Sequence, residues 1–227
     1  VVFQNRLGTL TWEKRDATSG DLICCATFVV EGTAGAAVGT SITVTDNQPP
    51  DTNPLAGVIT VSDLPTGTYT VTETVPPAGY ELPADASQEG IEIGPGEDNA
   101  DVTLSTDFED PRMLSELSVL KLDADTQAPL AGAAFELYLD RDGDGAAGVT
   151  DDAPDPDDAP AIGSCTTGDD GTCSVDSLDF GTYYWFEVSA PTGYQLPDDR
   201  TSNLITITSA NAGGEFDPAV FTDPQVR

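Results

Sequence analysis

The sequence is poor in several residue types, and each shortage excludes a class of protein. There is no histidine among the 227 residues, and 8 lysines and arginines face 40 aspartates and glutamates, for a net charge of -32. Nucleic acids and anionic membrane surfaces select basic patches, so neither is an expected partner. Without histidine, and with no separate pair of nucleophile and base, we do not expect an enzyme that turns over an external substrate.

Long apolar runs and helical periodicity are also lacking. No stretch approaches the length of a membrane span, and we find no signal peptide or sorting tail. The sequence instead has short Val, Thr and Ile runs between turns that draw on 22 glycines and 17 prolines, a pattern typical of all-β domains. The chain begins in mid-pattern, so we expect it to be a segment of a longer protein that is monomeric as a fragment.

One stretch occurs twice. Residues 67–80 and 181–194 carry Gly, Tyr, Glu, Pro and Gly-Tyr at the same spacing. If each stretch is a strand with a period of two, one face of the first copy holds Tyr69, Val71, Glu73 and Val75. A carboxylate on an apolar face is costly unless it is paired, hydrogen-bonded or protonated. The repeat therefore predicts two similar domains, and it singles out Glu73 and Glu187.

The two lysines of the chain occupy equivalent positions. Lys14 and Lys121 each lie on the apolar face of a predicted strand, although lysines that serve solubility would be numerous and outward-facing. The last predicted strand of each half, residues 102–108 in the first, leads into an aspartate, Asp110 or Asp223. Each half therefore places one Lys, one Glu and one Asp on inward faces.

This combination suggests covalent chemistry. Burial lowers the pKa of a lysine and raises that of a carboxyl group. A neutral amine is a nucleophile, and a protonated Glu can donate to a carbonyl oxygen. Beside an aspartate in a dry core, the amine could form an amide while Glu shuttles protons and water leaves. The alternative is a buried, hydrogen-bonded ion network without a covalent bond.

These residues also carry a resemblance to a known family. Three features resemble the Cna B-type domain: Lys-x-Asp, a Leu-Ala-Gly-Ala-x-Phe segment at 130–135, and Gly-x-Tyr-x-x-x-Glu-x-x-x-Pro-x-Gly-Tyr. In the first half the second segment lies at 23–28, where Cys24-Cys25 replaces the Ala-Gly pair. That family builds the stalks of Gram-positive surface adhesins and pilins. The resemblance implies an all-β chain of two tandem immunoglobulin-like or transthyretin-like β-sandwich domains. It also implies spontaneous Lys14–Asp110 and Lys121–Asp223 isopeptide bonds, formed with the help of Glu73 and Glu187.

The expected organisation follows from the two copies. Residues 1–8 are the tail strand of a preceding repeat or a linker, 9–113 the first domain, and 114–227 the second. The resemblance implies a covalently rigidified stalk segment, outside the cell and anchored to the wall or part of a pilus, with neighbouring domains of the same array as partners. The main alternative is a ligand-binding adhesin module that recognises a host protein or glycan, and a third possibility is an accessory domain of a secreted hydrolase.

An acidic loop in the second half matches a calcium-binding template. Oxygen ligands are expected at its positions 1, 3, 5, 7 and 12, with glycine at position 6. The candidate ligands are Asp140, Asp142, Asp144, the backbone carbonyl of Ala146, and Asp151. The loop therefore predicts Ca²⁺ as a cofactor, although Asp replaces the usual bidentate Glu at the last position. The alternative is a solvated acidic loop, because further aspartates follow directly.

The four cysteines form two close pairs. Cys165 and Cys173 flank a short turn, which we expect to join two strands of a hairpin. A disulfide there would stabilise the domain by about 2–3 kcal/mol in the chain-entropy model, and the alternative is two unpaired thiols. Cys24 and Cys25 are adjacent, and neighbours on a strand point to opposite faces. A vicinal disulfide, one buried thiol, or a partner in a missing segment all remain open for them.

Overall fold

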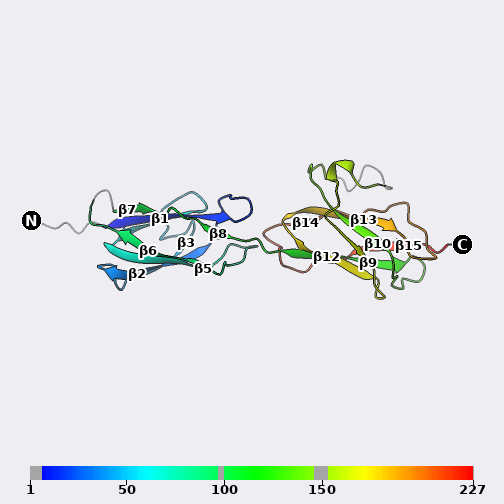
Figure 1. The fold of residues 1–227 in the computed structure, drawn as a ribbon, viewed down its shortest axis with the longest axis horizontal. Helices are drawn as coiled ribbons and strands as arrows, with labels where there is room; N and C mark the ends of the chain where they lie inside the picture. The colour runs from blue at the N-terminus through cyan, green and yellow to red at the C-terminus, as the bar shows by residue number, and fades with distance from the viewer. Residues whose placement is uncertain (1–6, 97–99, 146–152, 227) are drawn as a thin grey trace, which may run out of the picture. The chain divides into compact units, whose positions relative to one another are not determined.

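The computed structural model describes residues 7–96, 100–145 and 153–226. The chain divides into two compact units between Arg112 and Met113, and each unit consists of two β-sheets (Figure 1). No helix in these described ranges is long and apolar enough to cross a membrane. The predicted all-β class with two tandem β-sandwiches is confirmed.

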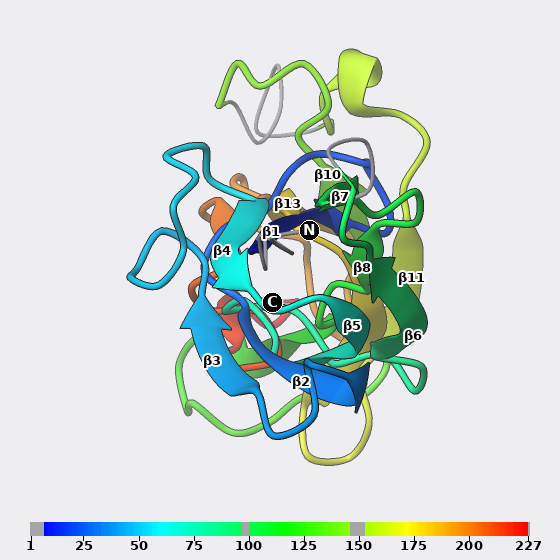
Figure 2. The ribbon, with the colours of Figure 1, turned by 90° about the vertical axis from the view of Figure 1, so that its left-hand side faces the viewer.

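The first unit encloses its core between a sheet of order β4-β1-β7, in which β8 also pairs with β1, and a sheet of order β3-β2-β5-β6. In Figure 2 the second of these sheets lies along the lower side of the unit. Trp12, Phe28 and Tyr69 come from both sheets and are fully buried in one cluster. The strands are β1 (Gly8–Asp16), β2 (Thr27–Gly35), β3 (Ser41–Thr45), β4 (Val58–Leu64), β5 (Gly67–Val75), β6 (Ser87–Ile93), β7 (Asp101–Thr103) and β8 (Phe108–Asp110).

The second unit repeats this topology. Its sheets have the orders β12-β9-β15 and β11-β10-β13-β14, so β9, β10, β13 and β15 take the places of β1, β2, β5 and β8. The internal repeat of the sequence is therefore also a repeat in three dimensions. The strands are β9 (Ser115–Asp123), β10 (Ala134–Leu139), β11 (Gly163–Thr166), β12 (Thr172–Leu178), β13 (Gly181–Ser189), β14 (Ile205–Ile207) and β15 (Ala219–Asp223).

Side chains alternate as predicted along most of these strands. Buried and half-buried residues alternate without exception along β1, so Lys14 points into the core with Leu10 and Trp12. The same alternation buries Glu73, but the expectation for Val75 was wrong, because its side chain is 53% exposed. The pairing of β5 with β2 shifts register just before Val75, and an extra residue there reverses the face to which the next side chain points.

The predicted strand over residues 102–108 is split. Thr103 of β7 pairs with Thr11, and Phe108 of β8 pairs with Lys14, so β1 advances three residues while the other segment advances five. The surplus residues cannot join the ladder, and the strand is interrupted between β7 and β8. Phe108 still reaches the core, whereas Thr106 is exposed.

The predicted disulfide between Cys165 and Cys173 is confirmed, but its setting differs from the expected hairpin. Cys165 lies on β11, which pairs with β10, whereas Cys173 lies on β12, which pairs with β9. The turn at residues 167–171 therefore passes the chain from one sheet to the other. As a result, the disulfide joins the edges of the two sheets across the sandwich.

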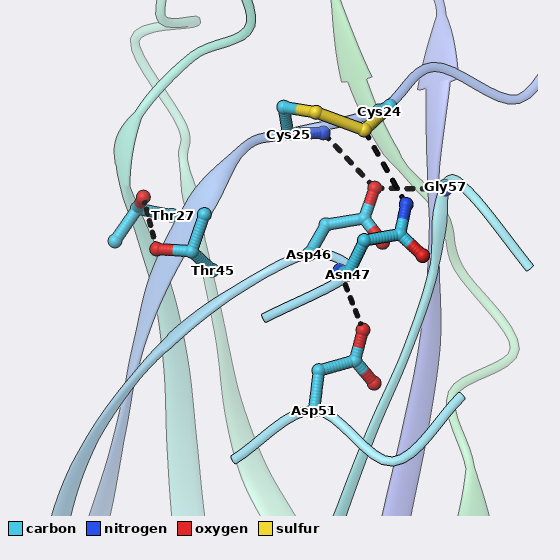
Figure 3. Close-up of a disulfide and its surroundings, with 8 residues drawn as sticks. All are labelled: Cys24, Cys25, Thr27, Thr45, Asp46, Asn47, Asp51 and Gly57. Atoms are coloured by element: carbon cyan, nitrogen blue, oxygen red, sulfur yellow. Dashed lines mark hydrogen bonds between the residues drawn. A yellow bond between two sulfur atoms is a disulfide. The ribbon is translucent and has the colours of Figure 1, made fainter. Parts of the chain in front are cut away.

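The other two cysteines form a vicinal disulfide between adjacent residues, Cys24 and Cys25 (Figure 3). The buried carboxylate of Asp46 accepts hydrogen bonds from the backbone N–H groups of Cys25 and Gly57, at 2.9 and 2.8 Å. The Asn47 side chain also contacts the sulfur of Cys24, at 3.4 Å. The disulfide is thus held at a point where the segment before β2 meets the loop between β3 and β4.

The backbone explains why this position is unusual. Cys25 has a φ of 82°, in the left-handed region that side chains other than glycine rarely occupy. Its equivalent in the second unit is Gly132, with a φ of 89°, and a Cβ built there would meet no heavy atom within 4 Å. The fold therefore requires a left-handed backbone conformation at this position and leaves room for a side chain. In the first unit a disulfide-bonded cysteine takes the place of glycine.

This comparison predicts the effect of removing the disulfide. With Cys24→Ala as a common background, Cys25→Gly should be more stable than Cys25→Ala by about 1–2 kcal/mol, because alanine is disfavoured in the left-handed region. Denaturant unfolding of the two double variants measures the difference. Equal stabilities would show that the disulfide, and not the fold, sets the backbone conformation.

Candidate functional site: two buried lysine triads

The first triad is assembled from three strands of the first unit. Lys14 lies near the end of β1, and Asp110 ends β8, the parallel neighbour of β1 in the same sheet. Glu73 comes from β5 in the opposite sheet, where it pairs with Phe28 of β2. The Nζ atom of Lys14 is 2.9 Å from Glu73 Oε2 and in direct contact with Asp110 Oδ1. All three side chains are fully buried.

The second unit contains the same arrangement. Lys121 Nζ lies 2.6 Å from Glu187 Oε2 and 2.5 Å from Asp223 Oδ1, and these side chains are again fully buried. Lys121 and Asp223 are separated by 102 residues, so their contact connects the first and last strands of the unit. The structure thus brings together each predicted set of Lys, Glu and Asp.

The surroundings of the triads are apolar and largely aromatic. Phe28 and Phe108 pack edge to face in the first unit. Phe28 is the cross-strand partner of Glu73, and Phe108 is that of Lys14. In the second unit Lys121 Nζ lies 5.9 Å from the ring centres of both Phe135 and Phe221. The apolar side chains offer no hydrogen bonds, so the three polar groups of each triad depend on one another.

The carboxyl groups are satisfied only in part. Within the described residues, Glu73 Oε1 and Asp110 Oδ2 have no hydrogen-bond partner, and the same holds for the corresponding oxygens of Glu187 and Asp223. Burial raises the pKa of Glu73 to about 7; Lys14 opposes this shift and the nearby Asp110 carboxyl adds to it. Burial likewise raises the pKa of Glu187 to about 7. At neutral pH each site can therefore hold an additional proton on a carboxyl group.

This geometry permits proton exchange and acyl transfer. An amine and a carboxyl group are in contact, and a second carboxyl group with a pKa near neutrality touches the same amine. Such a group can take a proton from one partner and return it to another, which is general acid–base catalysis. The reactants are also held in place by the strands, so the entropic cost of bringing them together has been met on folding.

The relationship to known proteins agrees with this architecture. The family model of SpaA, a prealbumin-like fold domain, matches residues 8–107 and again residues 115–215. The chain belongs to this family. It contains two SpaA domains in tandem, which confirms the relationship inferred from the sequence motifs and the predicted transthyretin-like fold. No curated protein is significantly similar to the chain in sequence.

Among solved structures, the Bacillus anthracis TIE protein has a similar fold, with a TM-score of 0.57 and 21% identity over 97% of this chain and 34% of that protein. The Streptococcal ancillary pilin gives a TM-score of 0.37 and 21% identity over 97% of this chain and 62% of the pilin. The minor pilin of Streptococcus agalactiae gives a TM-score of 0.37 and 18% identity, over 97% of this chain and 97% of the pilin. The chain thus spans 34% of the TIE protein and 62% of the ancillary pilin.

The SpaA domains also contain a polar cluster whose role the sequence did not reveal. In the first domain the buried Asp16 carboxylate accepts hydrogen bonds from Tyr80 Oη at 2.8 Å and from Arg112 Nε at 2.6 Å. Two backbone N–H groups, of Thr18 and Ser19, complete its coordination. This cluster connects the end of β1 to the residues that directly follow Asp110, so it positions Asp110 beside Lys14.

The second domain repeats the cluster around Asp123. Its carboxylate accepts from Tyr194 Oη at 2.8 Å and from Gln225 Nε2 at 2.9 Å, with two further backbone donors. The signal was present in the sequence, since the Asp of Lys-x-Asp and the Tyr of Gly-Tyr occur in both halves. Their contact could not be inferred because the two motifs are far apart in the chain.

The residues of the predicted calcium loop are only partly brought together. Asp140 and Asp142 lie close to each other and to Asp158, which was not among the predicted ligands. Asp144 is exposed and donates its backbone N–H to Asp142 Oδ1 at 3.1 Å. Ala146 and Asp151 lie outside the described residues.

The Asp16 cluster predicts an acid-sensitive contribution to stability. Burial alone would raise the pKa of Asp16, but hydrogen bonds from Arg112, the backbone and Tyr80 outweigh it and lower the pKa to about 2. Because the folded pKa lies below the unfolded value of about 3.9, the stabilisation is complete above about pH 4 and is lost as the pH falls towards 2. The difference in unfolding free energy between wild type and Asp16→Asn should therefore shrink over this interval.

Denaturant unfolding of the first domain between pH 2 and 6 measures this effect. Asp85→Asn makes the same charge change at an exposed position of the same domain and serves as the control. Tyr80→Phe removes one of the donors and should cost about 1–2 kcal/mol at pH 7. A pH-independent difference for Asp16→Asn would contradict the assignment.

Proposed function

We propose that this chain is a structural stalk segment of a Gram-positive surface adhesin or pilus protein. In this proposal each SpaA domain locks itself with a Lys–Asp isopeptide bond, Lys14–Asp110 in the first and Lys121–Asp223 in the second. The observation that supports it most directly is the contact of each lysine with an aspartate and a glutamate in a fully buried, apolar site. The partners would be neighbouring domains of the same array, outside the cell.

The reaction balances with the groups present. Glu73 accepts a proton from the Lys14 ammonium and delivers it to the Asp110 carboxylate, so a neutral amine faces a neutral carboxylic acid. The Nζ atom attacks Asp110 Cγ, and Glu73 donates a proton to the departing hydroxyl after taking one from the nitrogen. An Nζ–Cγ amide bond forms, the Cγ–OH bond breaks, and one water leaves. Glu73 ends as it began, although each domain reacts only once and turns over no external substrate.

Covalent closure also accounts for an otherwise unfavourable core. A buried ion pair with incompletely paired carboxyl oxygens costs several kcal/mol relative to a fully satisfied one. Formation of the amide removes one positive and one negative charge from the core, and the glutamate can donate to the new carbonyl oxygen. Both domains keep this arrangement, although they differ in the aromatic residues and cysteines around it.

The bond would serve a mechanical role because of the strands it joins. Lys14 lies on the first strand and Asp110 on the last, and the two strands are adjacent and parallel. In the chain-entropy model, a tie that closes a loop of about 100 residues stabilises by about 4–5 kcal/mol. A domain closed in this way cannot be pulled out into an extended chain, which is what a stalk requires.

Intact mass tests the proposal directly. Reduced, denatured wild-type protein should be lighter than its sequence mass by two waters. Glu73→Ala and Glu187→Ala should each restore one water, because the amine and the aspartate remain but the proton shuttle is lost. Glu92→Ala removes an exposed glutamate from the first domain and should leave both bonds intact.

Amine labelling in denaturant provides an independent readout, because the chain has no other lysines. An acylating reagent should modify neither lysine of the wild type, Lys14 in the Glu73→Ala variant, and Lys121 in the Glu187→Ala variant. A wild-type mass equal to the full sequence mass, together with two reactive lysines, would show that the triads are unreacted ion networks.

The bond should also dominate the stability of its own domain. Glu187→Gln keeps the size of the side chain but cannot shuttle protons as a carboxyl group does, so the second domain should remain open. Its unfolding free energy should fall by about 4–5 kcal/mol, the contribution of the lost loop closure, while the first domain is unchanged. Denaturant unfolding of the two-domain chain, with mass measured on the same sample, tests this expectation.

A further inference from the structure

The second domain carries an inserted segment that the first domain lacks. Residues 140–162 connect β10 to β11, whereas residues 36–40 connect the equivalent strands β2 and β3. Backbone hydrogen bonds fix both ends of the insertion to the sheet, from Asp140 N to Thr182 O and from Ile162 N to Leu137 O, each at 2.8 Å. Figure 1 shows its short 3-10 helix, η2 (Pro156–Asp158), as a yellow-green coil.

The sheet beneath the insertion has been adapted to hold it. Tyr138, Tyr184 and Phe186 form a separate buried cluster, in which the two tyrosine rings stack at 5.5 Å. The first domain has half-buried Thr70 and Thr72 where the second has Tyr184 and Phe186. The hydroxyl of Tyr184 accepts a hydrogen bond from the backbone N–H of Asp155, which caps η2. The described parts of the insertion, residues 140–145 and 153–162, are therefore built on a dedicated aromatic surface.

Three carboxyl groups of the insertion converge at one place. One oxygen from each of Asp140, Asp142 and Asp158 lies within 4.8 Å of the others. Asp142 is exposed, Asp140 is half-buried and Asp158 has no exposed surface. Asp158 Oδ1 accepts the backbone N–H of Arg141 at 2.6 Å, which brings η2 against the start of the insertion.

The second oxygen of Asp158 distinguishes this group from an ordinary acidic loop. Among the described residues, the buried Asp158 Oδ2 has no hydrogen-bond partner. Two more carboxylates stand next to it, and within the described residues none of the three forms an ion pair with a lysine or an arginine. A buried carboxylate in such a position is strongly disfavoured unless a cation or a proton accompanies it.

We propose that Asp140, Asp142 and Asp158 bind one calcium ion, with the buried Asp158 as the fixed ligand. Calcium binds 6–8 oxygens at about 2.3–2.6 Å, so oxygens around one ion lie up to about 5 Å apart, a spacing that the three carboxyl groups satisfy. Magnesium requires a near-ideal octahedron at about 2.1 Å and suits a group of loop carboxylates less well. The ion links the start of the insertion to η2 and so holds the two ends of the loop together.

Calcium titration of the full two-domain chain by calorimetry tests the site. We expect one saturable site, with a dissociation constant of about 10⁻⁴–10⁻³ M as in extracellular calcium modules, and weaker magnesium binding. Asp158→Asn and Asp142→Asn should each weaken calcium binding on the order of tenfold or more. Asp169→Asn removes an exposed charge from the turn before β12 and should leave the affinity within twofold, which controls for the general attraction of an acidic chain.

Thermal unfolding provides a second readout, which is informative even if the change in calcium affinity is too small to measure by calorimetry. Without calcium, Asp158→Asn should equal or exceed wild type in the melting temperature of the second domain, because a buried unpaired charge is removed. With saturating calcium the order should invert. Absence of saturable binding, or equal losses in all three variants, would overturn the proposal.

Discussion

The contact between a lysine amine and an aspartate carboxyl group in a fully buried, apolar core is the constraint on which each domain depends. It requires a strand that places lysine inward, a parallel last strand that ends in aspartate, and a glutamate reaching across from the other sheet. The strict alternation of β1 and the bulge-free part of β5 provide the first and third of these. Most of the sandwich can be understood as the framework that holds these three groups at bonding distance.

The cluster around Asp16, with its counterpart at Asp123, explains how the last strand of each domain is held in register with the first. The aspartate two residues after each lysine binds a tyrosine from the loop after β5 or β13. It also binds a side chain two residues beyond Asp110 or Asp223. The lysine–aspartate contact and the cluster therefore lie side by side at the ends of the same two parallel strands. A shift of one residue in the parallel pairing would break both at once.

The fold and the two triads could be predicted because their signals are local and repeated. Alternation with period two orients Lys14 and Glu73, and the scarcity of lysine identifies those that matter. Features that depend on long-range register were missed: the outward turn of Val75, the interruption after β7, and the placement of Cys165 and Cys173 on different sheets.

The remaining features were hidden for other physical reasons. Whether Cys24 and Cys25 pair with each other depends on a left-handed backbone conformation at Cys25. In the sequence, the only indication of that conformation is the glycine at the equivalent position, Gly132. Asp158 is one of the aspartates that follow the predicted calcium loop, and nothing in the sequence shows that η2 returns to the start of the insertion. Its burial follows from the aromatic surface around Tyr184. That this surface is specific to the second domain is seen only when the sequences of the two domains are aligned with each other.

The parallel pairing of the first and last strands has a consequence for how tension would pass through a cross-linked domain. A pull on the two ends would travel along β1 to Lys14, cross the amide, and leave through Asp110, so residues 15–109 would carry almost none of it. Loops within residues 15–109 could therefore lengthen or shorten without reducing the tension that the cross-linked domain withstands. The long insertion of the second domain lies in the corresponding interval, between Lys121 and Asp223. A cross-linked domain could therefore gain a binding feature there without losing resistance to tension.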